Sequence, residues 1–322
     1  MRRTLRLGIL LLLIALLCSR ITLVLHELVG HGLTAIAVGA GVKGYHLFYF
    51  AGGYIEFEGA FTTVSALMVS LGGIALELVL GIIALACARW WRPTESSGPG
   101  RRIAHAGALG VAAIEIVHAL YYLGAGTFHG YGDGAELHRL LGPSRLVLVA
   151  PVSLLAIAAA YLLARALGST LREWLSTLSP RGQLGAIAGA VAIAAAGHAA
   201  LTFGELAVTP SRSYAQVMKH QSVREAEVEL AHYYRAQLER GARLSQAELE
   251  AKRSDLIAQR RPFPLHLTLA VLLLIAMALG VARARAAPGR APVEVPSWAA
   301  LRWPAAAVLG SLALIAALRL AG

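Results

Sequence analysis

The stretch LGILLLLIALLCSRITLVLHELVGHGLTAIAVGA, residues 7–40, decides what kind of fold this chain adopts. It is longer than the roughly 20 apolar residues that cross a bilayer, so it predicts a membrane helix. Inside it stand His26, Glu27 and His31. Because ionisable side chains are costly at membrane depth, their presence indicates a functional site. The chain is therefore interpreted as a membrane protein that carries chemistry in its first span.

The composition of the whole chain favours the same interpretation. Of the 322 residues, 57% are hydrophobic and only 15% are charged, which is typical of an integral membrane protein. The formal net charge is +11, but the arginines stand at the ends of apolar segments. Such a placement indicates membrane orientation, so we expect a lipid bilayer as partner and no nucleic acid. The cysteines, Cys18 and Cys87, form no disulfide framework and no thiolate metal motif.

Seven apolar segments are long enough to be transmembrane helices. They lie at about Leu7–Ala40, Thr62–Ala88, Ile103–Leu123, Leu146–Leu167, Gln183–Phe203, Leu265–Val281 and Trp298–Leu320. The fold class that they predict is an all-α polytopic membrane protein of about seven transmembrane helices.

The basic residues also predict how the chain is oriented. They precede the first segment and follow the second, fourth and sixth. By the positive-inside rule, we expect the N-terminus in the cytoplasm and the protein in the bacterial inner (plasma) membrane. A cleaved signal peptide remains an alternative, because basic residues precede the apolar stretch Leu7–Leu17, although no small-x-small cleavage site follows.

Between the first two spans, Val42–Phe61 is rich in aromatic residues around Gly52-Gly53. This pattern predicts a short β-hairpin, Tyr45–Phe57. An open strand edge cannot face lipid, so the hairpin belongs at the interface or against the helices. An edge strand beside a catalytic site could also pair with an extended peptide.

The segment 205–264 has the signals of a helical hairpin outside the membrane. Ser222-x-x-Glu225 and Ser245-x-x-Glu248 fit capping boxes, and Gly241 stands where the first helix should end. We expect helices at Val223–Arg240 and Gln246–Arg260. The chain then divides into a membrane core, two further spans, this hairpin and two C-terminal spans, at residues 1–145, 146–204, 205–264 and 265–322.

His26, Glu27 and His31 are the residue types of a hydrolytic zinc site. In the common motif, His-Glu-x-x-His, the histidines share a helix face and the glutamate accepts a proton from water. Here the histidines are five residues apart, which turns them about 140° from each other on a regular α-helix. A π-bulge absorbs one residue and restores the shared face. If both histidines bind one metal ion, the helix must be bulged near Val29-Gly30.

Two later motifs accompany the histidines. Gly73-Ile74-Ala75-Leu76-Glu77 stands in the second span, and Gly130-Tyr131-Gly132-Asp133-Gly134 follows the third. Together with the first motif and the Gly-Gly hairpin, they resemble the site-2 protease family of intramembrane zinc metalloproteases over about residues 10–145. The resemblance implies Zn²⁺ held by His26, His31 and Asp133, and Glu27 as the catalytic base. It also implies hydrolysis of a membrane-protein or peptide substrate.

The chain departs from the family's pattern in ways that leave the third ligand open. Glu77 replaces the asparagine of the family's Gly-Pro-x-x-Asn, and no Asn-Pro precedes the Asp-Gly. The stretch HELVGHG resembles the HELLGHG of the dipeptidyl peptidase III family, which implies a glutamate ligand on a later helix. Glu77 and Glu115 are then rivals of Asp133, as is His129, four residues before it. Asp133 also fits a simple turn aspartate.

Other functions stay open as well. His26-x-x-x-x-His31 fits a loose histidine box, so a membrane di-iron oxidase or desaturase is one alternative. Glu115-x-x-His118 and Glu229-x-x-His232 have the spacing found in di-iron bundles, but we expect the two pairs in different compartments and interpret them as a coincidence. The chain has no adjacent His-His pair, which counts against an oxidase or desaturase. The other alternative is a catalytically inactive, protease-like membrane scaffold. His118 is expected to line the cavity or to orient a ligand. The sequence indicates neither the substrate nor the oligomeric state.

Overall fold

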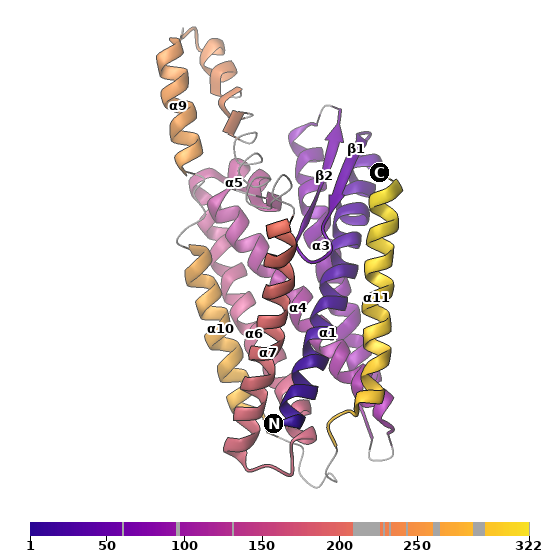
Figure 1. The fold of residues 1–322 in the computed structure, drawn as a ribbon. Coiled ribbons are helices and arrows are strands. Elements are labelled where there is room, and N and C mark those ends of the chain that lie inside the picture. Colours follow the sequence, from indigo (N-terminus) through magenta and orange to yellow (C-terminus); the bar gives the residue numbers. More distant parts are fainter. Residues whose placement is uncertain are drawn as a thin grey trace.

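The computed structural model is a bundle of long helices with one small sheet at the end opposite the N-terminus (Figure 1). It describes residues 1–59, 61–94, 97–130, 132–208, 226–227, 229–231, 233–242, 244–259, 265–285 and 294–321. Within these residues, six helices are long and apolar enough to cross a membrane. The expected fold class, an all-α polytopic membrane protein with a β-hairpin after the first span, is confirmed.

The first span is one continuous helix made of three parts. It consists of α1 (Arg2–Val24), the π-helix η1 (Leu25–Leu33) and α2 (Thr34–Ala37). Five further helices have the length of a span, and their bounds are α3 (Thr63–Trp90), α4 (Pro99–His129), α6 (Leu146–Trp174), α7 (Pro180–Val208) and α11 (Trp298–Ala321).

Shorter elements complete the bundle. The turn η2 (Gly132–Gly134), helix α5 (Ala135–Leu141) and the turn η3 (Gly142–Arg145) join α4 to α6. The segment predicted as the sixth span forms α10 (Leu265–Arg283), which packs along α6 (Figure 1). This helix is apolar but shorter than the six that are long enough to cross a membrane.

The outer faces of the helices carry large apolar side chains that a soluble protein would bury. The most exposed of them include Val64, Ile82, Leu154, Leu274 and Leu309. They belong to four helices, α3, α6, α10 and α11, so the outward surface of the bundle is rich in apolar side chains. This surface fits the hydrocarbon interior of a bilayer, in which apolar side chains are the favourable ones.

The predicted hairpin is present as two antiparallel strands. Strand β1 (Gly41–Leu47) pairs with β2 (Gly53–Glu58), with Tyr45 opposite Ile55. The Tyr45 hydroxyl donates to the carbonyl oxygen of Leu318 in α11 at 3.0 Å. On the other side, β2 packs against η1, where a Cβ added to Gly32 would lie 3.3 Å from Cδ1 of Ile55. The sheet therefore lies between the last helix and the motif of the first span.

Charged side chains from three helices contact the turn of this hairpin, and two of them, Arg20 and Glu205, are buried. The carboxylate of Glu205, in α7, accepts three backbone N–H groups from residues 49–51 at 2.6 to 3.0 Å. The guanidinium of Arg20, in α1, donates to two carbonyl oxygens of the same turn at 2.7 and 3.1 Å. The Arg319 guanidinium, in α11, lies 4.5 Å from the ring centroid of Tyr49. These contacts satisfy the backbone groups of the turn where water is scarce.

The predicted helical hairpin outside the membrane agrees with the structure in the part of it that is described. Helix α9 (Gln246–Gln259) begins with the expected capping box, in which Ser245 and Glu248 exchange hydrogen bonds of 2.7 and 3.3 Å. The N–H of Ser245 lowers the pKa of the exposed Glu248 carboxyl. Gly241 ends the preceding helix with a positive φ of 77°. The first capping box, Ser222 and Glu225, lies outside the described residues.

We predict that Glu205→Ala destabilises the protein, because three backbone donors lose their acceptor and the Arg319 guanidinium, 3.9 Å away, loses its counter-charge. Removing one partner of a buried, charged hydrogen-bond network costs about 3–5 kcal/mol. The thermal unfolding midpoint of the detergent-solubilised protein measures the effect. Glu250→Ala, on the exposed face of α9, is the matched control and should unfold as the wild type does. Equal midpoints for wild type and Glu205→Ala would contradict the role of Glu205.

Candidate metal centre

A π-helix absorbs the extra residue between the two histidines. Element η1 extends over nine residues, Leu25–Leu33, and continues directly from α1 into α2. The predicted distortion near Val29-Gly30 is thereby confirmed, and it is spread over two turns. As a result, the rings of His26 and His31 lie on the same side of the helix, with their centroids 4.6 Å apart.

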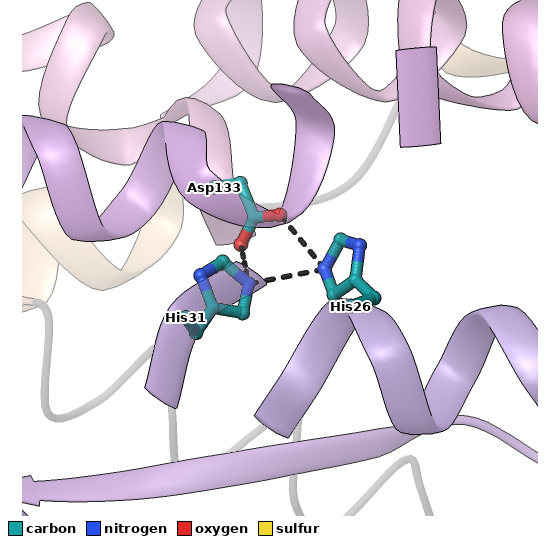
Figure 2. A group of neighbouring side chains, drawn as sticks. All are labelled: His26, His31 and Asp133. Atoms are coloured by element: carbon teal, nitrogen blue, oxygen red, sulfur yellow. Dashed lines mark hydrogen bonds and ion pairs between the residues drawn. The ribbon is translucent and has the colours of Figure 1, made fainter. Parts of the chain in front are cut away.

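His26, His31 and Asp133 converge on one point (Figure 2). The two Nε2 atoms are 3.0 Å apart, and the carboxylate oxygens of Asp133 lie 3.1 Å from Nε2 of His26 and 3.2 Å from Nε2 of His31. The histidines are buried, and the Asp133 side chain is 13% exposed. This group could hold a metal ion. Donor atoms of a tetrahedral zinc ion lie about 3.3–3.5 Å apart, which is close to the spacing found here.

The far nitrogens of the two rings indicate which atoms carry the protons. Nδ1 of His31 lies 2.7 Å from the carbonyl oxygen of Val69, which can only accept a hydrogen bond. Nδ1 of His26 lies 2.8 Å from a carboxylate oxygen of Glu77, a contact of hydrogen-bond length that is not well aligned. With both protons on Nδ1, each Nε2 presents a lone pair to the centre of the group.

Two lone pairs and one carboxylate facing each other repel unless a cation lies between them. The buried Oδ2 atom of Asp133 has no hydrogen-bond partner among the described residues, although it points at this centre. An unpartnered buried carboxylate oxygen is costly, so it needs a positive charge to offset its desolvation. The donor set and its unsatisfied oxygen therefore fit a divalent metal ion.

Glycines allow helix α3 to lie directly against the centre. A Cβ added to Gly73 would stand 2.5 Å from Cε1 of His26 and 2.7 Å from Nε2 of His31. A Cβ on Gly30 would lie 2.6 Å from the Cα of Gly73, so the backbones of η1 and α3 touch. Gly30 therefore permits close packing of the two helices, and the backbone of Gly73 closes one side of the centre.

Glycines also place Asp133. Helix α4 ends at Gly130, which has a positive φ of 70°, and Gly132 has a φ of 53°. A Cβ on Gly134 would overlap the backbone of Gly126 and Thr127, so the turn η2 lies tight against α4. The chain turns back at the end of α4 and brings the Asp133 carboxylate to the histidines.

Glu27 stands in η1 beside the histidines. Its side chain is buried and interacts electrostatically with His26, His31 and Asp133. The residue expected to serve as the base is therefore in the same cluster as the expected ligands.

The rivals for the third ligand position have other contacts. Glu77 contacts Nδ1 of His26, the ring atom that faces away from the centre, and also contacts His118. Glu115 accepts hydrogen bonds from Thr22 and Cys18, on α1, the latter at 2.7 Å. Among the described residues, only the group with Asp133 brings three suitable donor atoms within 4.8 Å of one another. No sequence pattern indicates the Val69 carbonyl as the partner of His31, because every residue has a backbone carbonyl.

No protein-family model, no curated protein and no solved structure matches this chain. The chemistry of the site is therefore argued from its residues and their geometry.

We predict that Gly73→Ala abolishes metal binding, because the added methyl group would occupy the space between α3 and the histidine rings. Metal content per chain, measured by elemental analysis of purified protein, tests this. Gly107→Ala, on α4, is the control, since a Cβ there meets nothing within 4 Å, and it should bind metal as the wild type does. A Gly73→Ala protein with an unchanged metal content would contradict this packing.

Proposed function

We propose that the chain is a zinc metalloprotease that hydrolyses peptide bonds of membrane-embedded or membrane-adjacent substrates. The observation that carries the proposal is the convergence of His26, His31 and Asp133 beside a buried glutamate, Glu27. Catalytic zinc sites use three protein ligands and leave a fourth position for water or substrate. The resemblance of the motifs to the site-2 protease family supports the same assignment.

Zinc is favoured over iron by the residue next to the first ligand. Two histidines and one carboxylate also bind Fe(II) in non-haem oxygenases, so the ligand set alone is shared. Hydrolysis needs a general base such as Glu27 to accept a proton from water, whereas the reactions of iron oxygenases with O₂ do not. A di-iron site would need further carboxylates around a second ion, and the described residues form one three-donor group. The alternative of an inactive scaffold gives no reason for a buried base beside three ligand atoms.

The residues divide the proposed reaction among them. A zinc ion held by His26, His31 and Asp133 would polarise the scissile carbonyl and make a nearby water more acidic. Glu27 accepts a proton from the water as its oxygen adds to the carbonyl carbon. Glu27 then gives that proton to the amine nitrogen as the C–N bond breaks. The π-helix carries the base and two of the three ligands in one element, which holds them in position for the reaction.

The hairpin suggests how a substrate is presented. Strand β2 packs against η1, and an extended peptide that pairs with the free strand edge would run beside the centre. An extended conformation exposes the scissile bond, which a helix would shield. With the N-terminus in the cytoplasm, the hairpin end of the bundle lies toward the outside of the bacterial inner membrane.

We predict that Glu27→Gln keeps the metal and loses proteolysis, because the amide cannot accept the proton of water. Loss of a general base typically costs about 10²–10⁴-fold in rate. The paired measurements are zinc content and cleavage of a model transmembrane peptide in detergent or liposomes.

The double variant His26→Ala/His31→Ala should lose both zinc and cleavage, and Asp133→Asn should weaken zinc binding. Glu115→Gln is the control, because its carboxyl contacts α1 and not the centre. Cleavage by Glu27→Gln at the wild-type rate would exclude Glu27 as the base, and a metal-replete wild type without bound zinc would exclude the proposal.

A further inference from the structure

Glu77 joins one of the proposed ligands to a histidine that lies outside the centre. Its side chain is 3% exposed, and its two oxygens contact two different rings. Oε1 lies 2.8 Å from Nδ1 of His26, and Oε2 lies 2.9 Å from Nδ1 of His118. Since these residues belong to η1, α3 and α4, the contacts link three helices.

The Glu77 carboxylate has a physical effect on His26 that no other contact supplies. The negative charge of the Glu77 carboxylate, 2.8 Å from Nδ1, favours a proton on that nitrogen, and the lone pair of Nε2 then faces the centre. A carboxylate in this position also makes the imidazole a stronger electron donor to a metal ion. For His31 the same task falls to the backbone carbonyl of Val69, at 2.7 Å. The Nδ1 atoms of the two histidines thus have different partners. That of His26 faces a side chain, Glu77, and that of His31 faces a backbone carbonyl.

His118 in turn determines how Glu77 is oriented. Its ring is stacked on Tyr122, with the centroids 5.7 Å apart and the planes 13° from parallel. The His118 side chain is 55% exposed, whereas that of Glu77 is 3% exposed, so His118 lies nearer the surface of the bundle. By binding Oε2, the imidazole keeps Oε1 directed at His26 and partly offsets the cost of a carboxylate at membrane depth.

From this geometry we infer that Glu77 and His118 are positioning residues, which orient His26 and set how tightly the metal ion is held. The inference rests on the proposed metal centre, and it concerns affinity and not the chemical step. His118 acts on the centre only through Glu77. The two residues therefore form one series of contacts, His118–Glu77–His26, and removing either of them interrupts it.

Zinc affinity of the full-length protein in detergent, measured by competition with a chromophoric chelator, tests the inference. Glu77→Gln should weaken zinc binding by about 10–100-fold, the usual cost of losing a carboxylate partner of a histidine ligand. His118→Ala should weaken it less, because Glu77 remains present. The double variant should bind as weakly as Glu77→Gln alone, since coupled residues on one route are not additive.

Glu115→Gln is the matched control. Glu115 is likewise a buried carboxyl in a span, three residues before His118, but its partners Cys18 and Thr22 lie on α1. Its zinc affinity should equal that of the wild type. The absorption spectrum of the Co²⁺-loaded protein adds a readout of ligand geometry, and it should change in Glu77→Gln and not in Glu115→Gln. His118→Ala changes a half-exposed side chain, so it remains testable if Glu77→Gln fails to fold.

The outcomes separate this inference from the proposed function. Wild-type zinc affinity in both Glu77→Gln and His118→Ala would overturn the inference while leaving the protease proposal standing. An additive loss in the double variant would overturn the claim that His118 acts through Glu77. Weaker zinc binding in Glu77→Gln, together with a wild type that cleaves no peptide, would support the inference and remove the protease. A wild type that binds no zinc would overturn both.

Discussion

The mutual repulsion of two imidazole lone pairs and one carboxylate is the constraint on which the rest of this structure depends. These groups lie about 3 Å from one another inside an apolar helix bundle, where water cannot separate them. Such a group is tolerable when a cation occupies its centre. The surrounding elements are arranged so that the group stays together. The π-helix turns the histidines to one face, glycines let α3 close against them, and the turn η2 returns Asp133 from the end of α4.

The same need to satisfy polar groups away from water shapes the hairpin. Its turn is bound by Glu205, from α7, and by Arg20, from α1. Two charged residues that are far apart in the sequence therefore bind the same turn. The first span therefore has two polar sites at different depths. Arg20 holds the hairpin, and six residues later His26 begins the metal centre. Because β2 also packs against η1, the strand and the ligands are parts of one rigid unit.

Some of this could be predicted from particular residues. The spacing of His26 and His31 required a π-bulge, because a regular helix cannot bring residues five apart to one face. The Gly-Asp-Gly turn indicated Asp133, since it follows the end of a span that runs parallel to the first. Glu77 and Glu115 were equally plausible ligands in the sequence, and only their partners separate them. The convergence of Arg20 and Glu205 on the hairpin turn had no sequence signal, because they are far apart along the chain and belong to different spans.

The sequence by itself determined the kind of molecule and the stretch in which a functional site was to be expected. Apolar length and the positions of arginine indicate membrane helices, and ionisable side chains inside them indicate a site, because both follow from local transfer free energies. The tertiary structure alone decided which carboxylate joins the histidines, which one contacts Nδ1 of His26, and what holds the hairpin turn. Those assignments depend on the contact of helices distant in sequence, and close contact is set by where Gly30, Gly73 and Gly134 allow two backbones to touch.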